Sequence, residues 1–268
     1  MLILLPPSEG KSSPDAGPRL DLRALSFPSL TAPRRAVLTE LTTVCRGDVD
    51  AAATALGLGP TQRDVVRANA RLRTRSCAAA ITVYSGVLYD ALDAPSLAAR
   101  ARSRLDEHVV IASALWGLIR PADLIPAYRL SGSARLPGLA SLPALWKKPV
   151  GTVLSEVDDF VLDLRSGAYV ALGPLPRSTA ARAATVRVLT EKNGRRIVVS
   201  HFNKATKGRI VRSLVQSRRT PADVDDLAHE LTRSGFHVEP GSVVAGKARV
   251  IDVIVADPTG GTGRAGYG

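Results

Sequence analysis

Short apolar runs divide the chain, and their spacing predicts strands interleaved with helices. Residues 1–5 form an unbroken apolar run, which predicts a buried strand. Further runs predict strands at 78–84, 108–113, 169–174, 184–202 and 248–257. Helical spacing predicts helices at 34–44, twice within 49–75, just before His108, and at 208–217.

Turn-forming residues place the breaks between these elements. Lys192-Asn193-Gly194 predicts a hairpin turn within 184–202, because Asn-Gly adopts the backbone angles of a tight two-residue turn. Pro121 and Pro126 predict loop and edge structure at 120–132 rather than a long helix. Ser155 and Asp158 predict a capped helix at 155–164. Hairpins among the interleaved elements favour an α+β fold with a mixed sheet over a Rossmann fold.

Composition places the chain among ordinary globular proteins. Its 268 residues are 45% hydrophobic, enough to bury a sizeable core in one domain or in two closely packed ones, which we expect over 1–256 with a disordered tail at 257–268. The five-residue apolar start is too short for a signal peptide, and no run approaches a membrane span. Cys45 and Cys77 provide neither a disulfide framework nor a zinc site. We therefore expect a cytoplasmic protein with no membrane partner.

The formal net charge of +12 changes the expected partners. A field of this sign attracts nucleic acid, anionic membrane surfaces or phosphorylated metabolites. Alternatively, part of the excess reflects drift in an Ala- and Arg-rich chain, so the positions of the charges must decide.

Residues 49–75 are similar to a helix-hairpin-helix element. The Gly57-Leu58-Gly59 turn between two short helices would let the backbone approach a DNA phosphate, with the second helix pointing its positive end at it. Alternatively, the segment is a solvated surface. Its arginines are spaced four apart and would form one stripe if the second helix continues: Arg63, Arg67, Arg71 and Arg75.

Three other segments gather cations where an anion could bind. At the N-terminus, a strand leads into a turn that carries Ser8 and Lys11. In the proline-braced segment, Arg120 and Arg129 could clamp a phosphate or carboxylate, unless Asp123 pairs with one of them.

The third of these segments is 200–209. Here Lys204 and Lys207 are expected in a turn between a strand end at Phe202 and the next helix. The alternative is a basic loop in solvent.

The remaining polar residues suggest little chemistry. The four histidines lack the spacing of metal ligands, so we expect no metal and no cofactor. The acids at 156–159 are better explained by a solvated helix start than by acid–base catalysis.

The ordered set of motifs resembles the YaaA family of peroxide stress proteins over nearly the whole chain. The matching segments are Leu4–Lys11, Tyr84–Tyr89, Leu115–Pro121 with Asp123, Tyr128–Leu130, Trp146 and Phe202–Gly208. The resemblance implies a single-domain α+β fold with a basic cleft and a helix-hairpin-helix element, which would fall on 49–75. It also implies binding of duplex DNA and a role in limiting damage by peroxide and free iron.

This chain departs from one branch of that family. It opens with Pro-Pro-Ser-Glu-Gly-Lys in place of Ser-Pro-Ala-Lys, and Lys207 stands where that branch has arginine. We expect Ser8–Lys11 to form one wall of an anion-binding cleft, with Arg120, Tyr128, Arg129 and Lys204 on the others.

Two functions follow from these expectations. The first is a double-stranded DNA-binding protein of the peroxide response that contacts phosphates through the 49–75 element. The second is an enzyme that binds a phosphorylated or nucleobase-like anionic small molecule, in which Lys11, Tyr128 or Lys204 acts in catalysis. An open groove continuous with the 49–75 element favours the first, and a deep narrow pocket favours the second. An iron-handling protein is a weaker third possibility, because the histidine and cysteine inventory is poor.

Overall fold

The fold is given by a computed structural model that describes residues 1–192, 195–198 and 200–256. The expected hairpin turn at Asn193-Gly194 and the tail 257–268 lie outside the described residues. The strands that flank the turn are present: β7 (Ala183–Lys192) pairs antiparallel with β8 (Arg195–Val198), as the hydrophobic pattern predicted.

A mixed central sheet organises the molecule. Across the sheet the strands lie in the order β4-β3-β1-β6-β7-β10-β9, with β8 paired to β7. The remaining strands of the sheet are β1 (Leu2–Leu5), β3 (Val109–Ser113), β4 (Gly117–Ile119), β6 (Val161–Asp163), β9 (His237–Pro240) and β10 (Arg249–Val255). A separate pair joins β2 (Ala78–Ala79) to β5 (Leu124–Ile125).

The centre of this sheet is parallel, which the sequence did not predict. The neighbouring pairs β3–β1, β1–β6, β6–β7 and β7–β10 are all parallel, and the antiparallel strands β4, β8 and β9 are added to them. The fold is therefore a mixed α/β domain, nearer to α/β than the expected α+β arrangement. Parallel strands need crossover connections, which the intervening helices supply.

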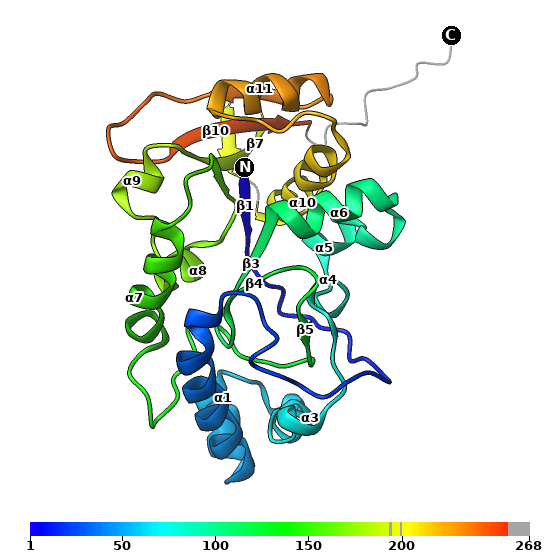
Figure 1. The fold of residues 1–268 in the computed structure, drawn as a ribbon, viewed down its shortest axis with the longest axis vertical. Helices are drawn as coiled ribbons and strands as arrows, with labels where there is room; N and C mark the ends of the chain where they lie inside the picture. Colours follow the sequence, from blue (N-terminus) through cyan, green and yellow to red (C-terminus); the bar gives the residue numbers. More distant parts are fainter. Residues whose placement is uncertain (193–194, 199, 257–268) are drawn as a thin grey trace.

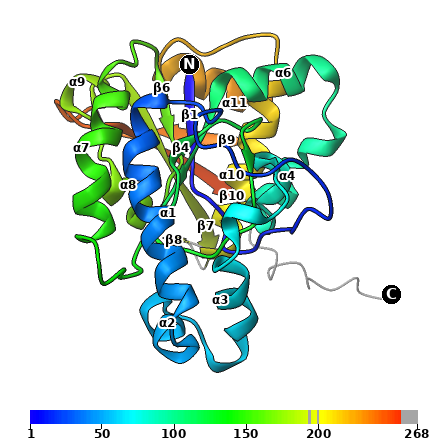
Figure 2. The same cartoon turned by 60° about the horizontal axis from the view of Figure 1, so that its bottom comes forward.

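Helices cover both faces of the sheet and extend beyond one edge. In Figure 1, α7 to α9 lie on one side of β1, and α5, α6 and α10 lie on the other. Figure 2 shows α1, α2 and α3 gathered at the end of the molecule toward which β1 points. The helices are α1 (Thr31–Arg46), α2 (Val49–Leu56), α3 (Arg63–Asn69), α4 (Ala80–Val83), α5 (Val87–Leu92), α6 (Ala99–His108), α7 (Leu142–Ser155), α8 (Gly167–Leu172), α9 (Arg177–Ala180), α10 (Ser200–Gln216) and α11 (Val224–Arg233).

Several expected elements differ in type. The predicted strand at 78–84 is the short β2 followed by α4, and the predicted strand at 169–174 lies largely in α8. The predicted helix at 155–164 contains β6 instead. The predicted strand over 184–202 ends early, because Ser200 already begins α10.

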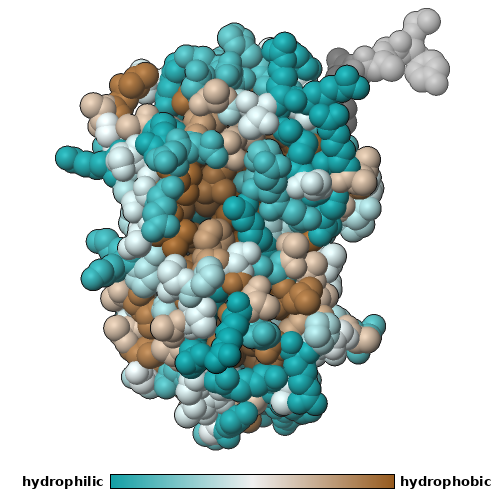
Figure 3. Space-filling view, viewed as in Figure 1, coloured by the Kyte–Doolittle hydropathy of each residue, from teal (hydrophilic) through white to brown (hydrophobic). Residues whose placement is uncertain are grey.

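The buried strand β1 sits at the centre of the core. Ile3, Leu4 and Leu5 are fully buried between β3 and β6. The face seen in Figure 3 is mostly hydrophilic, with hydrophobic side chains gathered in a hollow near the position of β1. Because β1 is held on both sides, the polar segment that follows it leaves the sheet at a fixed position.

Candidate functional site

The candidate site lies at the carboxyl edge of the parallel strands. The Pro6–Lys11 segment follows β1, Ser113 ends β3, and Leu164 follows β6. Since β3 lies on one side of β1 and β6 on the other, the chain connections diverge around β1. Ligands of open parallel sheets bind in the crevice formed at such a point.

The Ser8–Lys11 turn is held in place by its own hydrogen bonds and by the Tyr84–Ser85 backbone. The Lys11 ammonium donates to the Ser8 carbonyl at 2.6 Å, and the Ser85 N–H donates to Ser8 Oγ at 3.1 Å. Lys11 and Tyr84 form an isolated β-bridge. A side chain at Gly10 would press against Ser85 Oγ, 3.1 Å from an added Cβ. The turn therefore has a defined shape before any ligand binds.

Lys11 is the most perturbed basic group of this site. Its Nζ lies 4.3 Å from the ring centroid of Tyr128 and 5.2 Å from that of Tyr84. Burial, with a smaller contribution from nearby Arg129, lowers the pKa of Lys11 to about 7, and Glu9 opposes the shift. Close to neutral pH, a substantial fraction of this amine is therefore uncharged.

A chain of buried hydroxyls fixes the two tyrosine rings. Ser113 Oγ accepts from the backbone N–H groups of Leu115 and Trp116, so its own proton is directed to Tyr128 Oη at 2.7 Å. Tyr128 Oη in turn lies 2.9 Å from Tyr84 Oη and is left to donate to it. Burial raises the pKa of both phenols above the usual range. Both tyrosines therefore remain protonated, and their rings form a rigid aromatic wall beside Lys11.

Arg129 lies at the same wall and is tied to two other segments. Its guanidinium pairs with Glu9 at 3.1 Å. Its backbone N–H donates to Asn69 Oδ1 at 3.0 Å, and its carbonyl accepts from Asn69 Nδ2 at 2.8 Å. Asn69 is buried at the end of α3, so these bonds fasten α3 to the site.

Two adjoining cavities flank the Glu9-Gly10 backbone, which lines both of them. The first, which we call the Lys11 cavity, has a volume of about 300 Å³ and is bounded by α3, Lys11, Arg75 and Arg129. The second, the Lys204 cavity, has a volume of about 540 Å³ and lies among α5, α8 and α10. Together they form what we call the cleft. The charged side chains that line it are Glu9, Lys11, Arg75, Arg129, Lys204 and Lys207.

Lys204 and Lys207 belong to a helix rather than to the expected turn. Both lie in the first half of α10 and line the Lys204 cavity. Ser8 lines the same cavity from the segment after β1. Lys207 Nζ donates to the Leu164 carbonyl at 3.1 Å, and burial lowers the pKa of Lys207. Lys204 is exposed, so it is free to meet a ligand entering from solvent.

Arg120 is not part of the cleft, contrary to the expectation from sequence. Its guanidinium donates to the carbonyls of Asp106 and Glu107 at the end of α6 and lies 5.7 Å from the Phe27 ring centroid. Asp123 accepts from the backbone N–H of Arg120 instead of pairing with its side chain. This residue has a structural role, so the expected pair of clamping arginines is not formed.

The 49–75 segment contains two helices joined by the expected glycine turn. Asp48 caps α2, and Gly57 ends it with a left-handed φ of 64°. Gly59 and a 3-10 turn lead into α3. The structure thus places Gly57 and Gly59 in the turn between α2 and α3.

The expected arginine stripe does not form. Arg63 pairs with Asp50 at 2.7 Å, and Arg67 pairs with Asp64 at 3.1 Å, so both charges have partners. Because α3 ends at Asn69, Arg71 and Arg75 lie beyond the helix. Arg75 instead bonds to Ser13 Oγ at 2.8 Å and lines the Lys11 cavity.

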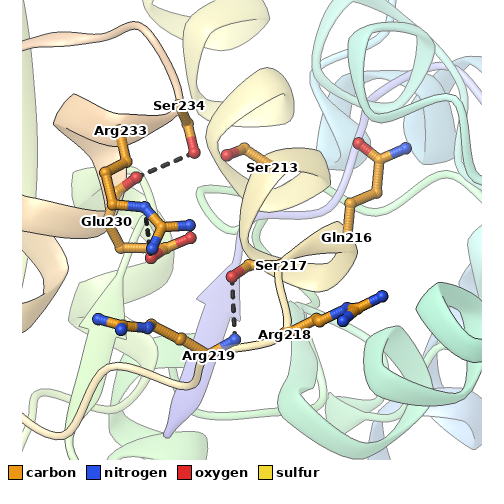
Figure 4. A pocket seen from close by; sticks show the side chains of 8 residues that line it. All are labelled: Ser213, Gln216, Ser217, Arg218, Arg219, Glu230, Arg233 and Ser234. Carbon is orange, nitrogen blue, oxygen red and sulfur yellow. Dashed lines mark hydrogen bonds and ion pairs between the residues drawn. The ribbon is translucent and has the colours of Figure 1, made fainter.

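A further cavity of about 540 Å³ lies between α10 and α11, away from every predicted site residue (Figure 4). Its arginines, Arg218, Arg219 and Arg233, point in different directions, and Arg233 pairs with Glu230 at 3.7 Å. The side chains therefore do not converge on one point, and we assign no site there.

The described residues offer few side chains for thiol chemistry or for binding a metal ion. Cys45 and Cys77 are free and buried, and burial raises the pKa of each thiol to about 11. Within the described ranges, no group of three or more His, Cys, Asp or Glu side chains is placed to hold a metal ion. The described helices include none that is long and apolar enough to cross a bilayer.

Comparisons with known proteins agree with the resemblance drawn from sequence. The profile of the family described as peroxide stress protein YaaA matches residues 1–241. The chain belongs to this family. A UPF0246 protein of Streptomyces coelicolor is 46% identical over 258 residues, covering 95% of this chain and 98% of the relative. A UPF0246 protein of Corynebacterium efficiens is 41% identical over 243 residues, covering 89% and 95%.

Sequence reasoning missed three members of the site. Ser113 ends an apolar run, and the rule that parallel strands present ligand-binding residues at their carboxyl ends could have singled it out. Glu9 lies within the family motif but was not given a role. Asn69 had no sequence signal, because its importance comes from contacts with a segment 60 positions away.

Proposed function

We propose that this protein acts in the peroxide stress response as a cytoplasmic DNA-binding protein, with duplex DNA bound along the cleft and the adjoining α2–α3 unit. The observation that carries this proposal is that α3 is itself a wall of the Lys11 cavity, locked there by Asn69 and Arg129. A cleft that is continuous with the surface of the α2–α3 unit suits an extended ligand better than a small one.

The charges of the cleft support the same choice of ligand. Five of its six charged side chains are basic, and the net charge of the whole chain is +12. Contacts of lysine and arginine with phosphates position a protein on DNA with little regard to sequence. We therefore propose largely sequence-independent binding, of plain and of distorted duplexes.

The proposed phosphate contacts are made by other residues than the arginine stripe expected from the sequence. Arg63 and Arg67 already have carboxylate partners, whereas Arg75 and Lys204 line the cleft. We propose Arg75 and Lys204 as the main phosphate contacts, with the backbone at Gly57 and Gly59 contributing from the α2–α3 turn.

Limitation of free-iron damage is proposed as a consequence of this binding. DNA phosphates hold a condensed atmosphere of cations, and a bound basic protein releases those cations. Ferrous iron displaced in this way generates its oxidising products further from the DNA. Protection of a bound duplex against iron and peroxide in solution tests this step.

The main test is fluorescence anisotropy with short plain and bulged duplexes across a salt series. Each neutralised phosphate contributes about 0.9 to the slope of log K against log salt, so Arg75→Ala and Lys204→Ala should each lower the slope by about one. Lys247→Ala, in an exposed loop outside the cleft, is the matched control. An absence of binding at low salt, or unchanged slopes in both cleft variants, would overturn the proposal.

A second candidate function rests on a single observation, the lowered pKa of Lys11 inside the cleft. Binding of a duplex requires only positive charge, whereas an amine that is partly neutral near pH 7 is suited to chemistry. Under this alternative the protein is an enzyme that acts on a phosphorylated or nucleobase-like small molecule. A thermal shift with nucleotides that Lys11→Ala removes would favour it.

A further inference from the structure

Lys11 occupies a position in which its amine can react. Its Nζ stands at the wall of the Lys11 cavity, 4.3 Å from the face of Tyr128 and 2.6 Å from the Ser8 carbonyl. The hydroxyl chain through Ser113 fixes the tyrosine rings, so the amine rests against a rigid support in a residue that lines the cavity. An exposed lysine has no comparable restraint.

The protonation state of Lys11 suits nucleophilic attack. At pH 7, roughly one in a few thousand molecules of an ordinary lysine carries a neutral amine. With its pKa lowered to about 7, Lys11 is neutral in about half of the molecules. Only the neutral amine has the free electron pair needed to attack an electrophilic carbon, and lysines desolvated in this way serve as Schiff-base nucleophiles.

The surroundings of Lys11 define the electrophile. Arg75 and Arg129 line the same cavity as Lys11, and Arg75, whose bond is to a neutral hydroxyl, would bind a phosphate of the compound that reacts. The cavity therefore fits an electrophilic carbon carried on a phosphorylated compound. The aldehyde of a ring-opened deoxyribose phosphate has both features, and it occurs in two sources, an abasic site in DNA and the free sugar phosphate.

We propose that Lys11 is a catalytic nucleophile that forms an imine with the aldehyde of a phosphorylated deoxyribose. The proposal deepens the DNA-binding function and rests on it for the abasic-DNA source. In the first step, the neutral amine forms a C–N bond to the aldehyde carbon, and the carbonyl oxygen receives one proton from nitrogen. In the second step, this oxygen leaves as water with the other nitrogen proton. Amine and aldehyde thus become imine and water, with no oxidant or reductant.

Other residues of the cavity support each step. Glu9, which lines the cavity and is paired with Arg129, would carry protons from nitrogen to the departing oxygen. The protonated imine is a cation, and the faces of Tyr84 and Tyr128 stabilise a cation at the position of Nζ. The same rings that help to keep the free amine desolvated would therefore stabilise its product.

Borohydride trapping tests the proposal directly. The wild-type protein is incubated with a duplex that holds one abasic site, with the same duplex undamaged, or with free 2-deoxyribose 5-phosphate, and borohydride then reduces any imine to a stable amine. Peptide mapping by mass spectrometry locates the adduct. We expect it on Lys11, with a trapping rate that rises as pH increases through about 7.

Variants separate nucleophilic attack from binding. Lys11→Arg retains the positive charge but lacks a nucleophilic amine, so we expect loss of trapping with duplex binding retained in the anisotropy assay. Lys247→Arg, at an exposed position outside the cleft, should trap at the wild-type rate. The mapping is made on the wild-type protein, so the result does not depend on the folding of any variant.

The outcomes distinguish the two proposals. Duplex binding without an adduct, or an adduct spread over exposed lysines, would overturn the role of Lys11 and leave the DNA-binding function intact. An adduct on Lys11 with the free sugar phosphate, in a protein that binds no duplex, would overturn DNA binding and support the nucleophile with the small source. An adduct with abasic duplex alone would support both proposals.

Discussion

Asn69 and Arg129, 60 positions apart in the sequence, are joined by two hydrogen bonds that run in opposite directions. The side-chain amide of Asn69 receives the Arg129 N–H at 3.0 Å and donates to the Arg129 carbonyl at 2.8 Å. The Asn69 side chain thus bonds to both backbone polar groups of Arg129, as the backbone of a neighbouring β-strand would. The α2–α3 unit and the wall of the cleft are thereby held as one body.

The first prediction concerns this link. Asn69→Ala leaves the N–H and carbonyl of Arg129 without their partners, and each unsatisfied buried group costs about 1–3 kcal/mol. We expect the free energy of unfolding to fall by about 2 kcal/mol or more, measured by urea denaturation. Duplex affinity should fall as well, because α3 is released from the cleft.

Two variants provide the controls for Asn69. Asn69→Asp places a carboxylate oxygen against the Arg129 carbonyl at a buried position, so it should lose at least as much stability as Asn69→Ala. Thr61→Ala alters an exposed position near the start of α3 and should change neither property. Equal stability of Asn69→Ala and the wild-type protein would show that the link is dispensable.

The second prediction compares Arg63 and Arg75, which the sequence analysis placed in the same arginine stripe. Arg63→Ala removes a charge already paired with Asp50 at an exposed site, so the duplex affinity and its salt slope should stay unchanged. Stability should change by no more than about 1 kcal/mol. Arg75→Ala should lower the slope by about one. Anisotropy titrations at four salt concentrations provide the test. A larger loss of salt slope for Arg63→Ala than for Arg75→Ala would show that DNA binds to the face of α3 that carries Arg63.

The third prediction is a pH dependence that arises from Lys11. The unfolded chain holds this proton up to about pH 10.5, whereas the folded protein releases it from about pH 7. Between these values the unfolded state binds more protons, so the wild-type protein gains stability as the pH rises. Below about pH 7 both states are protonated, and the cost of burying the charge is constant.

Lys11→Met removes this contribution and allows it to be measured. The stability of the variant relative to the wild-type protein should decline as the pH rises from about 7 to about 10, because only the wild type gains. Urea midpoints at several pH values provide the test. Lys247→Met serves as the control, since this exposed lysine lies outside the cleft. If the difference in stability between Lys11→Met and the wild-type protein does not change with pH, the pKa of Lys11 is not lowered in the folded protein.

The fourth prediction concerns a buried ion pair beside the Lys204 cavity. Arg165 and Asp163 pair at 2.7 Å with side chains that are 0% and 4% exposed, and Arg165 also donates to the Gly173 carbonyl. Asp163→Ala strands a buried cation and should cost about 3–5 kcal/mol of stability. The double change Asp163→Ala with Arg165→Met should be more stable than Asp163→Ala alone. The reverse order in thermal denaturation would show that the pair is not coupled.

The sequence predicted those elements whose pattern matches their packing. The run at 1–5 contains the strand β1, whose last three residues are fully buried, and the hairpin strands around Asn193-Gly194 are present. The expected strand at 78–84 fails because the N–H groups of Ala80 and Ile81 donate to the carbonyls of Asp123 and Pro121. These long-range bonds support a short helix at residues whose β-branched side chains favour a strand.

The candidate site shows the same limit. Lys11 and Arg129 were expected to share the cleft, and the structure brings both to the Lys11 cavity. Arg120 was expected there too, but it turns to the carbonyls at the end of α6, where the negative end of a helix attracts a cation. A basic residue in a motif shows that a partner exists, while the identity of that partner depends on contacts that sequence spacing does not encode.

The burial of Cys45 and Cys77 affects how readily peroxide can oxidise this protein. Peroxide attacks the thiolate form of cysteine, and both thiols are shielded from solvent and held protonated by their surroundings. The sole methionine, Met1, is only 8% exposed, so every sulfur atom of the chain is covered. Peroxide therefore meets no exposed sulfur on this protein, and we expect its cysteines and its methionine to oxidise slowly.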